Sequence, residues 1–369
     1  MRVLYDHQVF SLQNAGGMSR YFFELARYLS GIPEAHTEVW MGINGCVHPF
    51  QTLHPASTHV LAFPDWLGPG MARYLANELW CNANALFRGR FDIYHSTNLM
   101  RMPLVKAQRL VVTHHDCTHE RFPQYFPDVK KIYWARKRLF PQADAIICVS
   151  ESTRRDLLEF YDVDPQKTRV IHHGLTRLPR SAEAAAALRR QLQRDYILFV
   201  GMRPGFKNFQ GLLQAFSDNK LHKSLDLLVL GGAPLSAEEK SAIARLGLNG
   251  SVIWLPKVSD ETLAEAYAGA TLFVYPSFNE GFGFPMLEAM SLDCPVLASR
   301  IPSSVEISQD APFYFDVFDR GSFSREMLRA VSDEAARRRA VERGRRVLAE
   351  YSWEACGQKT LDVYLNASN

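Results

Sequence analysis

Short apolar runs alternate with stretches of helical spacing along most of this chain of 369 residues. A short apolar run bounded by polar residues predicts a buried strand, and apolar residues three or four apart predict a helix. In the first half, the predicted strands are residues 3–5, 93–95, 110–114 and 145–149, and the predicted helices are 21–29, 130–139 and 153–161. Such alternation favours parallel sheets covered by helices on both faces.

The alternation lapses within residues 175–193, where Pro, Arg and Ala are frequent, and then restarts. At roughly 100–200 residues per domain, the length suggests two domains. We therefore predict two α/β domains joined by this segment. In the second half, the predicted strands are 196–200, 225–230, 252–255, 271–275 and 295–298, and the predicted helices are 209–216, 237–246, 260–268, 285–292 and one basic stretch, 325–351.

Composition narrows the class of protein. The chain is 47% hydrophobic and 22% charged with a net charge of +3, which is ordinary for soluble globular proteins and too mild to support a nucleic-acid partner. Six scattered cysteines without a CxxC pair indicate reduced thiols and a cytoplasmic setting. The first residues resemble a strand more than a signal peptide, and no run approaches the ~18 apolar residues of a spanning helix.

One segment combines two acids with a glycine-rich turn after the predicted strand 271–275. A helix is expected to begin at Pro285, which puts Glu288 in its first turn. Backbone N–H groups at such a turn form an anion site suited to a diphosphate, and carboxylates accept hydrogen bonds from sugar hydroxyls. Alternatively, Glu288 only complements the helix dipole and Glu280 caps a turn. The residues of the turn are Glu280, Gly281, Phe282, Gly283 and Phe284.

A second candidate segment, 200–208, lies between a predicted strand and a predicted helix. It carries Arg203 and Lys207 on a turn rich in Gly and Pro. Arg203 offers a bidentate clamp for a diphosphate and Lys207 a point charge, and both would be needed to stabilise a leaving diphosphate without a metal. The alternative is a solvated loop.

Two polar segments follow strands in the first half. Gly16-Gly17 opens a helix and permits close backbone approach to a phosphate, although the segment is not a GxGxxG fingerprint. His115-Asp116 ends the predicted strand 110–114, where the pair could line a polar cleft or form an ordinary hydrogen bond at a sheet edge.

These segments together resemble glycosyltransferase family 4, the retaining GT-B enzymes, and in particular the bacterial surface-polysaccharide type. The most specific element is the E-x7-E motif at 280–288, and it is supported by 16–25, 115–116, 149–153, 200–208 and 352–354. The resemblance implies two Rossmann-like lobes whose parallel sheets face each other across a cleft. It implies lobe bounds of 1–177 plus a returning helix, 352–369, and of 178–351.

The resemblance also implies residue roles. Glu288 would bind the ribose, Glu280 a hydroxyl of the donor sugar, and His115 would lie beside the transferred sugar. Val258, in a loop where Pro256 replaces a common glycine, would lie near the base. The implied donor-binding residues are Gly17, Arg203, Lys207, Val258, Gly281, Phe282, Gly283, Phe284 and Glu288, and the implied catalytic residues are His115, Arg203, Lys207 and Glu280.

The implied reaction is hexosyl transfer with retention, in a front-face substitution where the departing diphosphate takes the proton of the acceptor hydroxyl. GDP-mannose ranks first as donor, ahead of UDP-hexose and deoxyhexose donors, and the acceptor is a glycan or lipid-linked glycan in polysaccharide or O-antigen synthesis. No cofactor or metal is expected, although Asp162-Val-Asp164 formally matches a DxD motif. The alternatives are another GT-B enzyme and a non-catalytic sugar-nucleotide-binding partner of a glycan assembly complex.

Residues 130–140 form a basic and aromatic stretch with two interpretations. It is either an interfacial helix that associates weakly with anionic lipid or a solvated helix with Tyr133, Trp134 and Phe140 partly buried. The second interpretation is preferred because one short helix contributes little membrane affinity.

Overall fold

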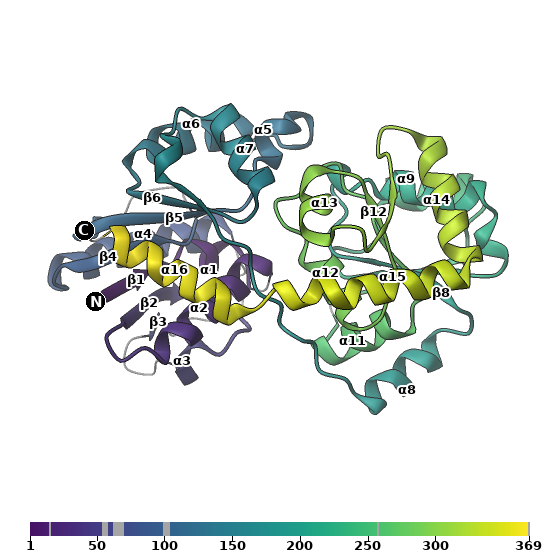
Figure 1. Cartoon of the computed structure of the whole chain (residues 1–369), viewed down its shortest axis with the longest axis horizontal. Helices are drawn as coiled ribbons and strands as arrows, with labels where there is room; N and C mark the ends of the chain where they lie inside the picture. Colours follow the sequence, from purple (N-terminus) through teal and green to yellow (C-terminus); the bar gives the residue numbers. More distant parts are fainter. Residues whose placement is uncertain (15, 54–57, 62–69, 99–103, 257, 368–369) are drawn as a thin grey trace. The chain divides into compact units, whose positions relative to one another are not determined.

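Two separate parallel β-sheets organise the chain (Figure 1). The structure is a computed structural model, and it describes residues 1–14, 16–53, 58–61, 70–98, 104–256 and 258–367. Each sheet belongs to one compact unit: unit 1 is Met1–Gly174 with Ser352–Asn369, and unit 2 is Leu175–Tyr351. The sequence had placed the first boundary after residue 177. Both units have the Rossmann-like alternation of strands and helices that the sequence predicted.

The sheet of unit 1 has the order β3-β2-β1-β4-β5-β6-β7, and its neighbouring strands are parallel. The sequence predicted β1, β4, β5 and β6 but missed the other three. β3 and β7 are short edge strands without a long apolar run, whereas β2 begins with polar residues and ends in a buried apolar run, residues 39–43, that was overlooked. The strands are β1 Arg2–Tyr5, β2 His36–Ile43, β3 Thr58–Leu61, β4 Phe91–Ser96, β5 Ala107–His114, β6 Ala145–Cys148 and β7 Thr168–Val170.

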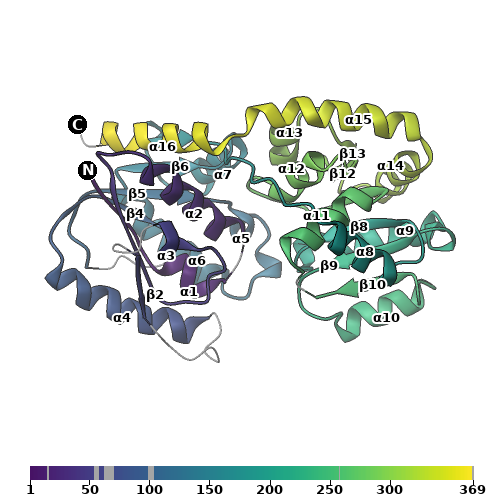
Figure 2. The ribbon, with the colours of Figure 1, turned by 90° about the horizontal axis from the view of Figure 1, so that it is seen from below.

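Helices cover both faces of this sheet. Figure 2 shows α16 and α2 together on one side and α4 on the other. The two paired helices approach so closely that a Cβ added at Gly357 would lie 2.3 Å from Tyr28 Cγ. The helices of unit 1 are α1 Gln8–Leu12, α2 Gly17–Ser30, α3 Phe50–Leu53, α4 Met71–Phe87, α5 Thr118–Arg121, α6 Val129–Leu139, α7 Glu151–Phe160 and α16 Trp353–Ala367.

The sheet of unit 2 has the order β10-β9-β8-β11-β12-β13 and is also parallel. Its strands are almost free of charge, as expected where helices cover both faces. The sequence predicted all but the last, which is three residues long. The strands are β8 Tyr196–Val200, β9 Asp226–Leu230, β10 Val252–Leu255, β11 Leu272–Tyr275, β12 Val296–Ser299 and β13 Phe313–Phe315.

The basic stretch that the sequence predicted to be helical is divided into two helices. Residues 325–351 are not one helix, because Asp333 ends α14 and its side chain accepts a hydrogen bond from Ala336 N at the start of α15. A 3-10 turn, Leu348–Glu350, then leads out of the unit. The helices of unit 2 are α8 Ala182–Gln191, α9 Phe209–Asp218, α10 Ala237–Arg245, α11 Asp260–Gly269, α12 Phe284–Ser291, α13 Pro302–Ser308, α14 Arg320–Ser332 and α15 Glu334–Val347.

Candidate functional site

The strand order of unit 2 reverses between β8 and β11. From β8 the chain proceeds outward to β9 and β10, whereas from β11 it proceeds in the opposite direction to β12 and β13. The loops that leave the carboxyl ends of β8 and β11 therefore diverge, and open parallel sheets bind ligands in the crevice between such loops. These two loops are 201–208 and 276–283, the segments that the sequence singled out.

Lys207 and Glu280 form an ion pair that connects the two loops. The ammonium also lies 5.5 Å from the ring centroid of Tyr275 and 5.3 Å from that of Phe206. Phe278 N donates a 2.8 Å hydrogen bond to the Phe206 carbonyl and so holds the loops together through the backbone. A cation on aromatic faces beside a carboxylate is positioned to meet an anionic ligand.

Tyr275 supports the carboxylate side of this pair. Its side chain is buried at the end of β11. Burial, followed by the negative charge of Glu280, raises the pKa of Tyr275 well above its ordinary value. The phenol therefore stays protonated at neutral pH and keeps a hydroxyl donor next to Glu280.

The glycine turn before α12 is buried and tightly packed. Gly281, Phe282 and Gly283 are buried and Phe284 is half-buried. Gly283 has φ +108°, and a Cβ there would lie 2.5 Å from Met286 Cε, so the turn requires glycine. The helix starts at Phe284, with no side chain capping its first turn, and such a helix N-terminus favours negative charge.

Glu288 lies on the buried side of α12 with 8% of its surface exposed. Tyr267 Oη donates to its Oε2 atom at 3.3 Å. Because the helix starts at Phe284 and not at Pro285, Glu288 is in the second turn, and the expectation of a first-turn position was wrong. Its charge is one of the causes that raise the pKa of Tyr275, which places both glutamates of the motif near one phenol.

Arg203 is directed at protein acceptors. Its Nε donates to Glu239 Oε1 at 2.8 Å, Nη1 donates to the Gly231 carbonyl at 3.2 Å, and Nη2 donates to the Ala233 carbonyl and to Glu239. Four of the five N–H groups of a guanidinium account for these bonds. The side chain is 4% exposed, so Arg203 shapes the turn after β9 in this structure.

Val258 lies apart from the glycine turn. It follows β10, the edge strand, two strands away from β8, and it is half-buried just before the N-cap of α11. Its neighbour Lys257 lies outside the described residues.

In unit 1, Gly17 is the exposed first residue of α2, and His115 follows β5. The imidazole of His115 packs edge-on against Tyr21 and stacks on His173, with centroids 5.7 Å apart in both cases. Its Nε2 atom is buried without a hydrogen-bond partner among the described residues. Burial lowers the pKa of His115 to about 4, so the ring is neutral at pH 7.

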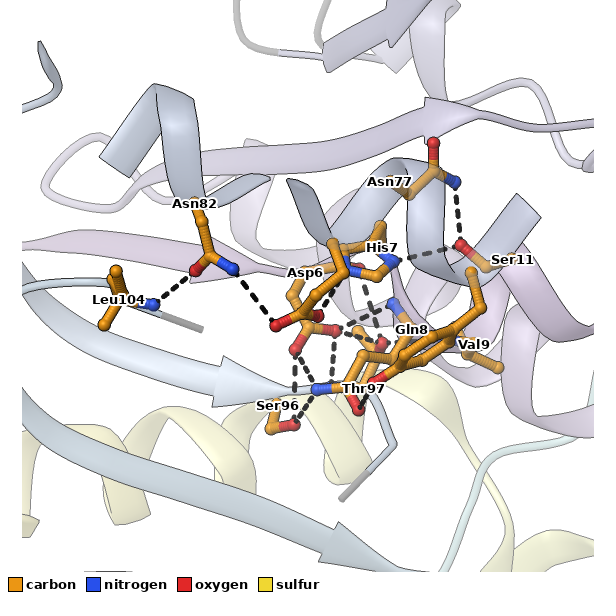
Figure 3. Close-up of polar contacts among 12 residues, drawn as sticks. Asp6, His7, Gln8, Val9, Ser11, Asn77, Asn82, Ser96, Thr97 and Leu104 are labelled. Atoms are coloured by element: carbon orange, nitrogen blue, oxygen red, sulfur yellow. Dashed lines mark hydrogen bonds and ion pairs between the residues drawn. The ribbon is translucent and has the colours of Figure 1, made fainter. Parts of the chain in front are cut away.

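Unit 1 contains a buried polar network that the sequence did not predict (Figure 3). It lies at the carboxyl ends of β1 and β4, where the strand order of that sheet reverses. Asp6 accepts hydrogen bonds from Gln8 Nε2 at 2.6 Å, Thr97 N at 3.2 Å and Ser96 Oγ at 3.3 Å, and from the hydroxyls of Tyr94 and Thr97. The sequence signal for this network was Asp6 itself, an acid directly after the first apolar run, residues 3–5.

The same network continues into α4. His7 Nδ1 lies 3.0 Å from Ser11 Oγ and its Nε2 lies 3.1 Å from Glu78. Asn82 donates to Glu78 at 3.3 Å and accepts from Leu104 N at 2.6 Å. Protein groups therefore occupy the reversal point of unit 1, whereas a charged pair lies at that of unit 2.

A second missed chain of hydrogen bonds joins the C-terminal helix to the sheet of unit 1. Tyr364 Oη lies 2.6 Å from His95 Nδ1, and His95 Nε2 lies 2.8 Å from Thr113 Oγ1. The hydroxyl of Tyr21 lies 3.0 Å from the same Thr113 oxygen. Because Tyr21 also contacts His115, this chain of contacts supports the position of the imidazole.

The candidate metal motifs have other partners. Asp164 caps the 3-10 turn Pro165–Lys167 by accepting from Gln166 N at 2.8 Å. Within the described ranges, His, Cys, Asp and Glu side chains form no group of three placed to hold a metal ion. Nor does any described helix combine the length and apolarity needed to cross a membrane.

Two family models match the chain in adjacent segments. The model described as Glycosyltransferase Family 4 matches residues 15–176, and Glycosyl transferases group 1 matches residues 181–347. The O-antigen chain mannosyltransferase B of Escherichia coli is 32% identical over 283 residues, which are 74% of each protein. A D-inositol 3-phosphate glycosyltransferase of Salinispora arenicola is 27% identical over an alignment of 395 positions, which covers 95% of this chain and 87% of the relative.

Solved structures share the fold along nearly the whole chain. WaaG, a glycosyltransferase involved in lipopolysaccharide biosynthesis, matches with a TM-score of 0.74 and 17% identity over 99% of both chains. HepE of Anabaena in complex with UDP and glucose matches with a TM-score of 0.74 and 16% identity over 99% of this chain and 100% of that one. At identities of 16% and 17%, the similarity to these structures shows a shared fold and nothing more.

Proposed function

The chain belongs to glycosyltransferase family 4 and has the GT-B fold, and from this premise we propose that it transfers a hexose from a nucleotide-diphosphate sugar to a glycan or lipid-linked glycan in O-antigen biosynthesis. GDP-mannose is the first candidate donor, because the Escherichia coli relative that is 32% identical is an O-antigen mannosyltransferase. A UDP-linked or deoxyhexose donor is the alternative. The transfer retains the anomeric configuration.

The ion pair between Lys207 and Glu280, located where the strand order of unit 2 reverses, carries this proposal. In the proposed complex, the diphosphate takes the place of Glu280 as the anion next to Lys207. Glu280 is then released to accept a hydrogen bond from a hydroxyl of the donor sugar. The same carboxylate thus neutralises the lysine before the donor binds and recognises the sugar afterwards.

The backbone of the glycine turn complements the lysine. Gly281, Phe282, Gly283 and Phe284 lie at the start of α12, where the helix dipole favours a diphosphate. Glu288, in the next turn, would accept hydrogen bonds from the ribose hydroxyls. Val258 would lie on the base side.

Arg203 takes a different role in this proposal from the one that the family resemblance implied. Its hydrogen bonds to Glu239 and to two carbonyls support an indirect contribution, in which it holds the turn after β9 in shape. We retain a direct contact with the diphosphate as the alternative, to be tested by mutagenesis.

Unit 1 would supply Gly17 and His115. A neutral imidazole can donate one hydrogen bond and accept one, which suits a sugar hydroxyl that does both. The low pKa of His115, a consequence of burial, keeps the ring in this form at neutral pH. Gly17, at the exposed start of α2, would permit the close backbone approach to a phosphate that the family resemblance implied.

We propose that the departing diphosphate accepts the proton of the acceptor hydroxyl on the face where that hydroxyl attacks. The bond from the anomeric carbon to the phosphate oxygen breaks while the new glycosidic bond forms on the same face. Positioning and charge stabilisation are then the main tasks of the protein. Lys207 and the start of α12 supply the positive charge, so we propose that turnover needs no metal.

Nucleotide-dependent thermal shifts test the donor assignment. A bound nucleotide raises the melting temperature by mass action, so GDP at saturating concentration should do so and UDP, dTDP and ADP should not. Glu288→Gln should abolish the shift, whereas Lys240→Ala, on the exposed face of α10, should keep it. A shift with UDP alone would overturn GDP-mannose as donor.

Product analysis tests the reaction itself. GDP-mannose with a polysaccharide-derived acceptor should yield an α-linked product, identified from the one-bond coupling between the anomeric carbon and its proton, and added EDTA should leave the rate unchanged. A β-linked product would disprove retention, and inactivation by EDTA would disprove metal independence. Donor binding without any transfer or hydrolysis would favour a non-catalytic binding partner.

The cysteines support a cytoplasmic location, which we also propose. All six are free thiols, and five of them are buried. Burial raises the pKa of Cys356 and of Cys148 to about 12, so both thiols are protonated at neutral pH.

A further inference from the structure

The chain crosses between the two units twice, and both crossings start from the same place in unit 1. The chain leaves unit 1 after Gly174 and returns at Ser352. A Cβ added at Gly174 would lie 2.3 Å from Trp353 N and 2.6 Å from Ser352 C, both of them backbone atoms. The backbone of Gly174 is not left-handed, so glycine is needed here for the close approach of the two crossings.

His173, the residue before Gly174, is surrounded by aromatic rings. Its imidazole lies 4.6 Å from the ring of Tyr21 and 6.1 Å from that of Trp353, measured between centroids. It also stacks on His115, with centroids 5.7 Å apart and an angle of 28° between the ring planes. Tyr21 contacts the other two rings, at 5.7 Å from His115 and 6.4 Å from Trp353. We refer to Tyr21, His115, His173 and Trp353 as the ring cluster.

The four rings come from distant parts of the chain. Tyr21 belongs to α2 and Trp353 begins α16, whereas His115 and His173 follow β5 and β7. Because β5, β6 and β7 are parallel, their carboxyl ends lie at one edge of the sheet, and the two imidazoles meet there. The cluster therefore joins this edge of the sheet to the helix that returns from unit 2.

His115 is the member of the ring cluster that keeps the most exposed surface. Tyr21, His173 and Trp353 are buried, whereas His115 is half-buried. The three buried rings thus cover part of the His115 imidazole and leave the rest of its surface accessible.

His173 contributes a flat, uncharged ring to this arrangement. Burial lowers the pKa of His173 well below its ordinary value of 6.5, and the neighbouring imidazoles of His115 and His172 lower it further. At neutral pH His173 therefore adds no positive charge beside His115. Its contribution is the stacked contact.

A second path connects α16 to the same imidazole. Tyr364, in the last turns of α16, lies 2.6 Å from His95 Nδ1, and His95 Nε2 lies 2.8 Å from Thr113 Oγ1. Thr113 is two residues before His115 in the chain. Since Trp353 at the start of α16 belongs to the ring cluster, both ends of this helix contact segments that hold His115.

We infer that His173 is a positioning residue for His115, and that Gly174 and Trp353 fix His173 at the two crossings. The stacked ring sets the plane of the His115 imidazole before a sugar arrives. His173 and Trp353 each adjoin a crossing, so a change in the direction of either crossing acts on the rings that hold His115. This inference rests on the proposed function, in which His115 contacts the transferred sugar.

The alternative is that the ring cluster only fills the interior of unit 1. Filling alone predicts that loss of the His173 ring lowers stability and affects turnover equally with or without His115. Positioning predicts that the effect of His173 on turnover disappears once His115 is removed, because a residue that acts through another is not additive with it.

A double-mutant cycle on sugar transfer separates the two. His173→Ala should lower kcat by about 10–100-fold with little change in the donor KM, because misplacing a group by about 1 Å costs up to about 10²-fold in rate. In the His115→Ala background, His173→Ala should have no further effect. His173→Phe retains a flat ring and should keep most of the wild-type kcat. The matched control is His36→Ala, an exposed histidine at the start of β2, which should behave like wild type.

Gly174→Ala tests the contact between the two crossings. The new Cβ would collide with the backbone of Ser352 and Trp353, so the ring of Trp353 should shift and kcat should fall in the same His115-dependent way. Gly89→Ala is the matched control in the same unit. Its added Cβ would lie 3.4 Å from Arg2 Nη1, at the end of a flexible side chain, and kcat should not change.

Ring contacts measured by NMR test the positioning without an activity assay. With labelled tyrosine and histidine side chains, nuclear Overhauser contacts between Tyr21 and His115 should be present in wild type and in His173→Phe. They should be lost or much weaker in His173→Ala. Thermal melting of each variant shows that the chain is folded, and the nucleotide-induced thermal shift shows the same for unit 2.

Four outcomes would overturn the proposal. They are unchanged kcat in His173→Ala, additive effects of His173→Ala and His115→Ala, equal loss of kcat in Gly174→Ala and Gly89→Ala, and contacts between Tyr21 and His115 in His173→Ala as strong as in wild type. Absence of sugar transfer in the wild type would instead refute the proposed function, and the NMR comparison would still decide the role of His173.

Discussion

Lys207, in the loop after β8, forms an ion pair with Glu280, in the loop after β11. The pair bridges two strands that are neighbours in the sheet although 71 residues, 201–271, separate β8 from β11 in the sequence. Each residue neutralises the other in the absence of an anionic ligand. A diphosphate would therefore compete with Glu280 for the lysine, which makes the lysine the most informative residue to change.

Lys207→Ala should lower kcat by about 10²–10³-fold at saturating donor, because it removes a charge that stabilises the leaving diphosphate. Steady-state assays with GDP-mannose and acceptor measure this effect. Lys240→Ala, an exposed lysine on α10 of the same unit, should retain wild-type turnover and is the matched control. Near-normal turnover of Lys207→Ala would refute the proposed role.

Arg203→Met and Glu239→Gln should have similar and non-additive effects, since each breaks the same buried pair. Denaturant unfolding should give a coupling energy of about 0.5–3 kcal/mol between the two sites. Both variants should raise the KM for donor by similar factors if Arg203 only shapes the turn after β9. A loss of donor binding in Arg203→Met alone would instead indicate a direct contact with the diphosphate.

Gly283→Ala should destabilise unit 2 by about 1–3 kcal/mol, because φ is +108° there and the new Cβ would lie 2.5 Å from Met286 Cε. It should also weaken the nucleotide-induced thermal shift, since the turn lies at the start of α12. Gly250→Ala is the matched control: φ is +79° and no atom lies within 4 Å of its added Cβ. Equal effects of the two changes would mean that backbone strain alone accounts for the loss.

Stability of unit 1 should fall as pH falls below about 6.5. Burial lowers the pKa of His95 from its ordinary 6.5 to about 3, so between these values the unfolded chain binds a proton that the folded chain does not. The free energy of unfolding therefore decreases with acidification, by about 1.4 kcal/mol per pH unit for each such group. Burial shifts the pKa values of His114 and His173 in the same direction.

Denaturant unfolding at pH 5, 6 and 7, followed by hydrogen exchange in peptides from unit 1, measures this dependence. His95→Asn should reduce the slope of the unfolding free energy against pH by about 1.4 kcal/mol per pH unit, which corresponds to one proton. The absolute stability also drops, since the bonds to Tyr364 and Thr113 are lost, so the slope is the decisive quantity. An unchanged slope would show that His95 is not the group responsible.

Much of the fold was predictable because buried parallel strands leave a local signature. The apolar runs at β1, β4, β5, β6 and β8 to β12 were all predicted, since strands covered on both faces read as uninterrupted apolar segments. The short edge strands β3 and β7 lack such runs, and β13 is apolar but only three residues long. The break between α14 and α15 depends on one capping aspartate, Asp333, which a basic helical pattern conceals.

Helix α4 was missed for a different physical reason. Its polar residues face inward and its leucines face outward, so amphipathicity does not indicate which side is buried. The partners of Arg73 and Asn77 include Phe10 and Ser11 of α1 and Ile43 at the end of β2, which the sheet brings to α4. Tertiary contacts therefore decided the orientation of this helix.

Some features of the candidate site were likewise determined by the sequence, and others were decided only by the tertiary structure. The sequence by itself determined the chemistry of the E-x7-E segment, because glycines, a helix start and two acids are encoded within nine neighbouring residues, 280–288. It did not determine that Lys207 meets Glu280, that Arg203 turns away to Glu239, or that Asp6 is surrounded by donors. These partners are distant in the chain, and only the order of parallel strands brings the loops at their carboxyl ends within hydrogen-bonding distance.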